Sequence, residues 1–254
     1  MDDDSKLTWE EIIKINSNDI DFTGKLKLHT FCTYFFDLAS RHANHLQFGF
    51  KDLAQDNYYW VLSRLLVKIY KYPGFDHTIH ETTWPKGINR LFALRDYSIT
   101  DDRDNPIADA TSAWLMIDKS SGRPIDANNF FKTEYYNSDR AALDIFPEKI
   151  NPVKTTECSD IRQVYYSDID INNHVNAGKY ISWIQDLFPV EHYLENQIGM
   201  LQINYLSETR IGEKVQLFSE SEDIDQKNFR IEGRIENTQA PAFRARIEWG
   251  KINN

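Results

Sequence analysis

Apolar and polar residues alternate most regularly near the C-terminal end of the chain. Residues 242–249 would form a strand with four apolar side chains on one face and three charged ones on the other: Phe243, Ala245, Ile247 and Trp249 against Arg244, Arg246 and Glu248. Such alternation is typical of an antiparallel strand that covers a core with one face only.

Two stretches follow a helical period instead. Residues 177–188 repeat apolar side chains at i, i+3, i+4 and i+7, namely Tyr180, Trp183, Ile184 and Leu187. Residues 29–48 are apolar on nearly every side in their middle, from Phe31 to Ala39. A helix that is apolar all round is expected to be wrapped by other structure.

Strand patterns surround both helices in the same order. In the first half a strand is expected before the helix over 22–28, and four after it, over 60–72, 77–84, 88–98 and 108–118. The first of these four would place Val61, Leu65, Val67 and Ile69 on one face. In the second half a strand over 162–166 precedes the helix, and four follow, over 200–207, 214–220, 229–237 and 242–249.

The repeated order predicts an α+β protein with a tandem (double) hot-dog fold, in which two antiparallel sheets each wrap a long apolar helix. We expect an N-terminal hot dog over residues 1–121, a connector over 122–160 and a C-terminal hot dog over 161–254. Two such units in one chain would let their sheets pair. The connector is long for a loop, so part of it, 138–143, is expected to form a short helix.

Composition and charge argue against some classes of binding partner. The hydrophobic fraction is 41%, enough for a sizeable core, and the net charge of −10 argues against binding to nucleic acid or to an anionic membrane. Only two cysteines are present, Cys32 and Cys158, too few for a disulfide framework. The acidic start MDDDSKLTWEE lacks the apolar segment of a signal peptide, and no apolar run is long enough to span a membrane. We therefore expect a cytoplasmic protein.

One polar segment stands out just before the second helix. Within five residues it sets a carboxylate, a carboxamide and an imidazole: Asp170, Asn172 and His174. Backbone N–H groups at a helix start are unpaired and can stabilise an oxyanion. These residue types are also common in turns, so the triplet alone favours a loop over a catalyst. Glu208, at the end of the strand after the helix, adds a fourth polar group.

Over nearly its whole length the chain resembles the acyl-acyl carrier protein (acyl-ACP) thioesterases of plants and bacteria. The matching residues in the second half are SDID-x-N-x-HVN-x-x-KY-x-x-W (167–183) and INYLSETRIGE (203–213). In the first half they are WVLSR (60–64), YPGF (72–75), LRDY (94–97) and ATSAWLMIDKSSGRP (110–124). Several motifs in the right order are more specific than the triplet alone.

The resemblance implies hydrolysis of the thioester between a fatty acyl chain and acyl carrier protein. The sequence contains no metal-binding or nucleotide-binding motif, so we expect no cofactor or metal. The resemblance assigns the active site to Asp170, Asn172, His174 and Glu208. The family often has a cysteine directly after this glutamate, but here the residue is Thr209. We therefore hypothesise that Glu208 activates water or attacks the thioester itself. His174 and Asn172 would position the water or the carbonyl, Asp170 would orient one of them, and a backbone N–H at the helix start would hold the oxyanion.

The first half has no equivalent triplet before its helix, since His29 and Thr30 stand there as helix start and cap. This asymmetry predicts one active site per chain. The first half would supply the acyl pocket, with Trp60, Leu62 or Phe92 as candidate lining residues; a role in the core alone is equally open for each. His42 and His45 are expected on the helix surface, because no third metal ligand accompanies them.

Docking of an acidic carrier protein would need a local basic patch. Candidates are Arg64, Lys68 and Lys71 along one strand, with Lys25 and Lys27 close in the sequence; simple exposure to solvent is the alternative for each.

Three other functions stay open to test. An acyl-coenzyme A thioesterase is the main alternative. A hot-dog hydratase would resemble Asp-x-Asn-x-x-His, one residue longer than the spacing here, and a transcriptional acyl sensor would need a DNA-binding extension. The acyl chain length cannot be read from the sequence, and the oligomeric state is open, a homodimer being one alternative.

Overall fold

The computed structural model describes residues 7–130, 136–137 and 139–252. The chain divides into two compact units. The N-terminal unit contains residues 1–26 and 31–147, and the C-terminal unit contains residues 27–30 and 148–254. The division between the units after Pro147 falls within the segment that the sequence analysis assigns to the connector.

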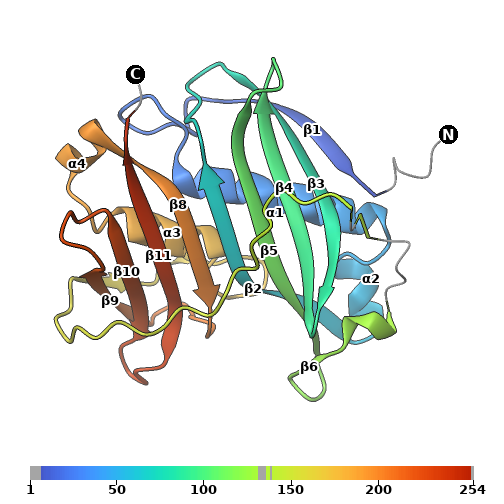
Figure 1. Cartoon of the computed structure of the whole chain (residues 1–254). Coiled ribbons are helices and arrows are strands. Elements are labelled where there is room, and N and C mark those ends of the chain that lie inside the picture. The colour runs from blue at the N-terminus through green and yellow to red at the C-terminus, as the bar shows by residue number, and fades with distance from the viewer. Residues whose placement is uncertain (1–6, 131–135, 138, 253–254) are drawn as a thin grey trace. The chain divides into compact units, whose positions relative to one another are not determined.

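The N-terminal unit is an antiparallel sheet with one long helix, α1 (Leu28–His45) (Figure 1). Its strands run in the order β1-β3-β4-β5-β2, and the short β6 pairs with β5. They are β1 (Trp9–Lys14), β2 (Tyr58–Ile69), β3 (Thr78–Asn89), β4 (Phe92–Asp101), β5 (Pro106–Asp118) and β6 (Arg123–Ile125), and a short helix α2 (Phe50–Gln55) precedes β2.

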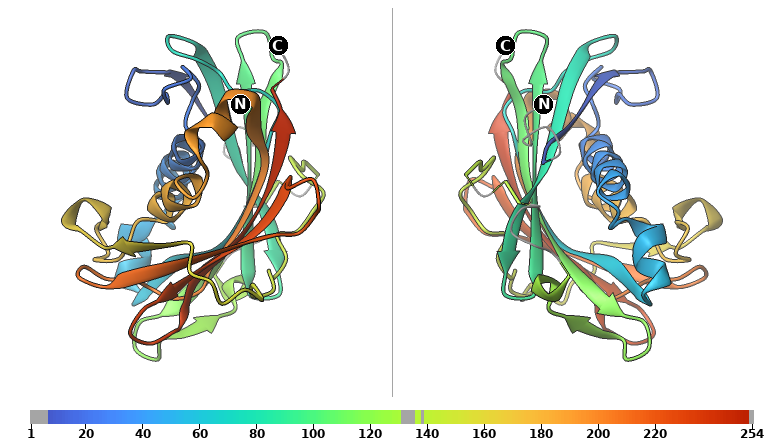
Figure 2. Two further views of the ribbon diagram at one scale, coloured as in Figure 1. Left: turned by 90° about the vertical axis from the view of Figure 1, so that its left-hand side faces the viewer. Right: turned by 90° about the vertical axis from the view of Figure 1, so that its right-hand side faces the viewer.

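The C-terminal unit has the same topology. Its strands run in the order β8-β11-β10-β9-β7, with the helix α3 (Ala177–Gln185) after the first strand in sequence. The strands are β7 (Asp160–Gln163), β8 (Asn196–Tyr205), β9 (Lys214–Ser221), β10 (Asn228–Ile235) and β11 (Pro241–Lys251), and α4 (Val190–Glu195) follows α3. In each unit the sheet curves past its helix (Figure 2), so the predicted hot-dog fold is confirmed for both halves.

Aromatic side chains join each helix to its sheet. In the N-terminal unit the ring of Phe35 lies 4.9 Å from that of Tyr97 on β4. In the C-terminal unit the ring of Tyr180 lies 5.1 Å from that of Phe243 on β11. The predicted alternation of β11 is confirmed, since Phe243 faces α3 while Arg244 bonds to Glu232 on the opposite face.

Two predicted strand features in the first half are wrong. Residues 22–24 form a turn, because the Asp21 carboxylate accepts the N–H groups of Thr23 and Lys25 and Gly24 has a φ of 78°. Lys25 and Leu26 make only isolated bridges, and Leu28 already belongs to α1. The first strand of this half is β1 instead. The face predicted for β2 is also wrong at Val61, because a bulge between Leu62 and Arg64 shifts the register and leaves Leu62, not Val61, on the face of Leu65.

The N-terminal part of the connector is tied to the face of its sheet that α1 does not cover. The buried carboxylate of Asp96 accepts the N–H of Ala142 at 2.7 Å and lies 3.1 Å from Nζ of Lys86. The indole of Trp84 donates to the carbonyl oxygen of Arg140. These contacts explain why 139–143 form no helix, contrary to the prediction, since their backbone groups bond to sheet side chains; Ser138 lies outside the described residues.

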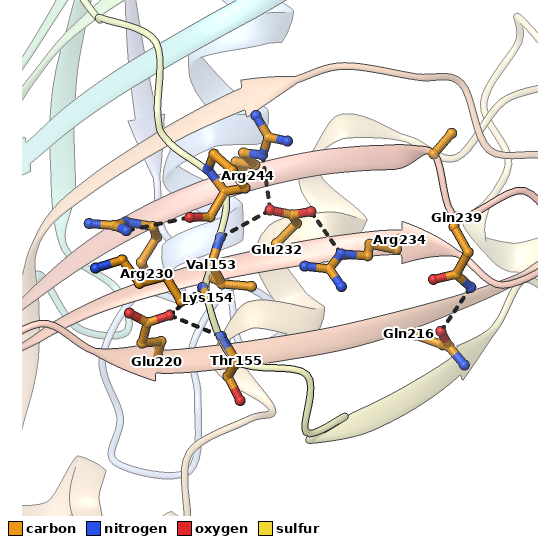
Figure 3. A network of polar contacts seen from close by, with 12 residues as sticks. Val153, Lys154, Thr155, Gln216, Glu220, Arg230, Glu232, Arg234, Gln239 and Arg244 are labelled. Atoms are coloured by element: carbon orange, nitrogen blue, oxygen red, sulfur yellow. Dashed lines mark hydrogen bonds and ion pairs between the residues drawn. The ribbon is translucent and has the colours of Figure 1, made fainter.

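The C-terminal part of the connector crosses the outer face of the second sheet, where charged side chains bind its backbone (Figure 3). Glu232 accepts the N–H of Val153, and Glu220 accepts the N–H of Lys154 at 2.6 Å. Glu232 also accepts from Nε of Arg234 and Nε of Arg244, at 2.8 and 3.0 Å. This buried carboxylate therefore joins the connector to two neighbouring strands.

Candidate active site

The polar triplet lies in a tight loop that leads into α3. Ile169 and Val175 form an isolated bridge, and the N–H of Asp170 donates to the carbonyl oxygen of His174 at 2.9 Å. Asn173 has a φ of 63°, a left-handed conformation that asparagine adopts more readily than most residues. Residues near in sequence therefore set the shape of this loop.

The start of α3 is fixed by capping. The Asn176 side chain accepts the N–H of Gly178 at 2.8 Å, and the N–H of Lys179 bonds to the Asn176 carbonyl oxygen. The hydroxyl of Tyr205 donates to the carbonyl oxygen of Ala177 at 3.2 Å. Within the described residues no hydrogen bond engages the Ala177 N–H, so it stays the candidate for the predicted oxyanion donor.

Two of the four predicted site residues meet directly. Nε2 of His174 lies 2.8 Å from Oε2 of Glu208, and both side chains are partly exposed. The segment that carries Glu208 is held against the loop by a bond from the Val175 N–H to the Thr209 carbonyl oxygen, at 2.9 Å. A carboxylate and an imidazole are thus held side by side, and both are partly open to solvent.

The other two site residues lie in the same loop, and their predicted roles stay predictions. Oδ1 of Asp170 accepts the backbone N–H of Asn172 at 2.8 Å, so this carboxylate orients the loop backbone. The Asn172 side chain is exposed, and in the described part of the chain it has no hydrogen bond to His174 or Glu208. Its carboxamide stands free for a substrate or a water.

Thr209 cannot replace a nucleophilic cysteine. Its side chain is buried, and among the described residues its hydroxyl has no hydrogen-bond partner. The two cysteines do not supply the missing thiol either. Cys32 is buried within α1, where burial raises the pKa of its thiol, and Cys158 is exposed beside β7.

Two residues near the site were not predicted from the sequence. The guanidinium of Arg210 lies 3.6 Å from Oε2 of Glu208, so a positive charge stands beside the candidate base. Tyr180 of α3 is buried, and burial raises the pKa of its phenol to about 12, which keeps it protonated. Arg210 follows Glu208 by two positions, but the sequence does not show that its side chain turns toward the Glu208 carboxylate.

The corresponding position in the first half differs, as expected. α1 starts at Leu28, so His29 lies inside its first turn rather than before it. Nδ1 of His29 lies 3.4 Å from Oε1 of Gln185, and burial lowers the pKa of this imidazole. The described residues place no carboxylate–imidazole contact like that of His174 and Glu208 here.

The three candidate pocket residues divide between the two faces of the first sheet. Trp60 and Leu62 lie opposite Met116 and Trp114, on the face that α1 covers. Phe92 lies on the other face, with its ring 5.7 Å from that of Phe146 in the connector. Phe92 is therefore not a lining residue between helix and sheet, while Trp60 and Leu62 keep that candidate role.

The expectation that His42 lies on the helix surface is wrong. The side chain is buried, and its Nδ1 lies 3.0 Å from the guanidinium of Arg95. Burial lowers the pKa of Arg95 to about 10. His45 is exposed as expected and packs against Trp9. Within the described residues, no group of three His, Cys, Asp or Glu side chains could hold a metal ion.

Two residues of the candidate basic patch contact other groups of the protein. The guanidinium of Arg64 donates to the carbonyl oxygen of Pro147 at 3.0 Å and lies 4.7 Å above the ring of Phe92. It is thus engaged by the connector. Lys71 is exposed but lies 3.6 Å from Asp101.

Comparison with known proteins identifies relatives of both halves. Residues 6–136 match the family model described as acyl-ACP thioesterase N-terminal domain, and residues 151–251 match that of the acyl-ACP thioesterase C-terminal domain. A chloroplastic acyl-[acyl-carrier-protein] hydrolase of Cuphea viscosissima is 24% identical over 262 residues, which cover 97% of this chain and 63% of the relative. A chloroplastic palmitoyl-acyl carrier protein thioesterase of Arabidopsis thaliana is 24% identical over 96% of this chain and 64% of the relative. The chain thus spans less than two thirds of these plant proteins.

Solved structures share the fold over nearly the whole chain. An acyl-ACP thioesterase from Bacteroides thetaiotaomicron is 27% identical, with a TM-score of 0.88 and coverage of 98% of this chain and 100% of that one. A 12:0-ACP thioesterase from Umbellularia californica is 16% identical, with a TM-score of 0.80 and coverage of 96% and 98%, and supports the fold alone. Separately, no helix among the described residues has the length and apolar character needed to span a bilayer.

Proposed function

Because the chain belongs to the acyl-ACP thioesterase family, we propose that it hydrolyses the thioester that joins a fatty acyl chain to acyl carrier protein. The products are the free fatty acid and the carrier thiol, so the reaction ends chain elongation. The observation that carries this proposal is the 2.8 Å contact between His174 Nε2 and Glu208 Oε2. This contact places the proposed base, Glu208, beside an imidazole, and neither cysteine of the chain lies at the site.

In the proposed reaction a water molecule attacks the thioester carbonyl carbon, and Glu208 takes a proton from that water. His174 donates a hydrogen bond to Glu208 and so fixes which carboxylate oxygen faces the water. The Asn172 carboxamide and the Ala177 N–H stabilise the oxyanion of the tetrahedral intermediate. The carbon–sulfur bond then breaks, and the proton held by Glu208 goes to the leaving thiolate. Asp170 acts as a positioning residue through the loop backbone.

Direct attack by Glu208 on the thioester is the alternative to base catalysis. It would form a mixed anhydride on the enzyme and release the carrier thiol first. Acid quenching within one turnover, followed by mass spectrometry of the intact protein, separates the two routes. An acyl adduct on Glu208 would assign nucleophilic catalysis, and base catalysis leaves the protein mass unchanged.

The carrier is tested by presenting one acyl chain on acyl carrier protein and on coenzyme A and measuring the free acid released. We expect a higher kcat/KM for the carrier protein thioester. A higher value for coenzyme A would replace the proposal with the acyl-CoA thioesterase alternative. A panel of acyl-carrier substrates of different lengths then defines the chain preference.

Location in the cytoplasm and assembly as a homodimer remain predictions. Cell fractionation and light scattering of the purified protein measure them.

A further inference from the structure

The peptide group between Ala177 and Gly178, in the first turn of α3, is hydrogen-bonded at both ends. Its carbonyl oxygen accepts the hydroxyl of Tyr205 at 3.2 Å, and its N–H, which belongs to Gly178, donates to Oδ1 of Asn176 at 2.8 Å. The preceding peptide group is held through its carbonyl oxygen, which accepts the N–H of Lys179 at 2.9 Å. These bonds fix the direction of the Ala177 N–H, which no hydrogen bond in the described part of the chain engages.

Tyr205 connects this turn to the segment that carries Glu208. It is the last residue of β8 and precedes Glu208 by three positions. The N–H groups of the next two residues, Leu206 and Ser207, both donate to the carbonyl oxygen of Ala242 on β11, at 2.9 and 3.2 Å. The backbone on which Tyr205 and Glu208 stand is therefore anchored to the sheet, and the Tyr205 side chain reaches from it to α3.

The environment of Tyr205 holds its ring in place. The ring is partly buried and lies 6.0 Å from that of Tyr180, which is itself buried on α3. In the N-terminal unit a tyrosine also follows the first strand after the long helix, but the hydroxyl of this residue, Tyr70, donates to Asp109 on β5 at 3.0 Å. The hydrogen bond from strand end to helix start thus belongs to the half of the chain that carries the His174–Glu208 pair.

We propose that Tyr205 is a positioning residue for hydrolysis, whose hydroxyl holds the first turn of α3 so that the Ala177 N–H points at the oxyanion. This inference rests on the proposed function, in which that N–H stabilises the tetrahedral intermediate. A donor is effective only when it already points to where charge develops, and a misplacement of about 1 Å can cost about 10² in rate. Because Tyr205 stands on the segment of Glu208, its bond sets the donor and the base relative to each other.

The first experiment removes the hydroxyl and keeps the ring, in Tyr205→Phe. With the fatty acyl thioester of acyl carrier protein, we expect kcat to fall about tenfold and KM to stay within about twofold of wild type, because the lost contact acts on the transition state. Tyr193→Phe is the matched control. The hydroxyl of Tyr193 donates to the carbonyl oxygen of Gln185, the last residue of α3, at 2.6 Å, and its loss should leave kcat unchanged.

The second experiment removes the donor itself, in Ala177→Pro. Proline is favoured at the first position of a helix, and Asn176, with φ of −58° and ψ of 137°, has the conformation that a residue before proline adopts. We expect kcat to fall by about 10². If Tyr205 acts through this N–H, adding Tyr205→Phe to Ala177→Pro should cost nothing further.

Other outcomes would overturn the proposal. An unchanged kcat in Tyr205→Phe, or a loss in KM alone, would remove Tyr205 from oxyanion stabilisation. An equal loss in Tyr193→Phe would indicate a general effect on α3, and a full further loss in the Ala177→Pro background would mean that Tyr205 acts through Glu208 instead. If circular dichroism shows that Ala177→Pro does not fold, the split between kcat and KM in Tyr205→Phe and its control decides.

Failure of the proposed function is distinguishable from failure of this inference. It appears in the wild type as a higher kcat/KM for the coenzyme A thioester, and the same variants then test Tyr205 on that thioester.

Discussion

Nε2 of His174 and Oε2 of Glu208 lie 2.8 Å apart, although the two residues stand on opposite sides of α3 in the sequence. The His174 loop enters α3, and Glu208 follows the strand β8 that comes after it. Their meeting is the structural basis of the proposed chemistry, because neither residue alone provides a fixed base with a defined oxygen facing the substrate.

Replacing the carboxylate of Glu208 should stop catalysis. Glu208→Gln keeps the side-chain shape but cannot take a proton, so kcat for acyl-carrier hydrolysis should fall by about 10²–10⁴. Glu236→Gln, which changes a half-buried carboxylate beside Lys214 just after β10, serves as the control. Near wild-type turnover in Glu208→Gln would remove this residue from the chemistry.

The Asp170 side chain should matter as a hydrogen-bond acceptor more than as a charge. Asp170→Asn can still accept the N–H of Asn172, whereas Asp170→Ala cannot. We expect kcat to fall by about tenfold or more in the alanine variant, because a lost loop contact misplaces Asn172 and His174, and by clearly less in the asparagine variant. Equal losses in both variants would point to the charge instead.

Thr209 should be dispensable for turnover. Thr209→Val keeps the volume and removes a buried hydroxyl without a partner among the described residues. We expect kcat within about threefold of wild type and unchanged or higher thermal stability, since burying an unpaired hydroxyl is costly. A large loss of kcat at unchanged stability would show that the hydroxyl takes part in the reaction.

Glu81 should make the stability of the N-terminal unit depend on pH. The side chain is buried on β3 with Oε1 unpaired among the described residues, and burial, with a smaller contribution from Glu11, raises its pKa well above 4.5. The folded state therefore binds this proton more tightly than the unfolded state. The resulting stability is complete below the unfolded pKa and is lost as the pH rises through the folded pKa.

Glu81→Gln removes this titration and should be the more stable protein at about pH 8, with the difference shrinking toward pH 4.5. A gain of about 1 kcal/mol would raise Tm by roughly 2–4 °C. Thermal unfolding across this pH range measures the difference, with Glu10→Gln at an exposed position of β1 as control. A pH-independent difference would contradict the assignment to Glu81.

Loss of Glu232 should release the connector from the second sheet. Glu232→Ala removes the acceptor for the Val153 N–H and leaves Arg234 and Arg244 without their carboxylate (Figure 3). The free energy of unfolding should fall by about 3–5 kcal/mol. Urea unfolding measures the loss, and limited proteolysis should cut near Val153 sooner. Gln216→Ala, which loses one exposed bond, should change stability by less than about 0.5 kcal/mol.

Particular elements explain what could be predicted. The alternation of β11 and the apolar spacing of α3 are local properties of the sequence, and both were predicted close to their observed bounds. β1 was missed and 22–28 was taken for a strand, because side-chain bonds from Asp21 decide that turn. The bulge in β2 could not be predicted either, because one extra residue in a strand leaves no recognisable mark in the pattern of apolar and polar residues.

The sequence by itself determined the order of elements in each half, the loop that holds Asp170, Asn172 and His174, and the absence of a cysteine after Glu208. These depend on residues close together in the chain. Only the tertiary structure decided that His174 contacts Glu208 and that His42 is buried beside Arg95. The same holds for the hydrogen bond from Arg64 to the connector. Such contacts join residues far apart in sequence, so they depend on strand register and on which face each side chain takes, and a single bulge changes both.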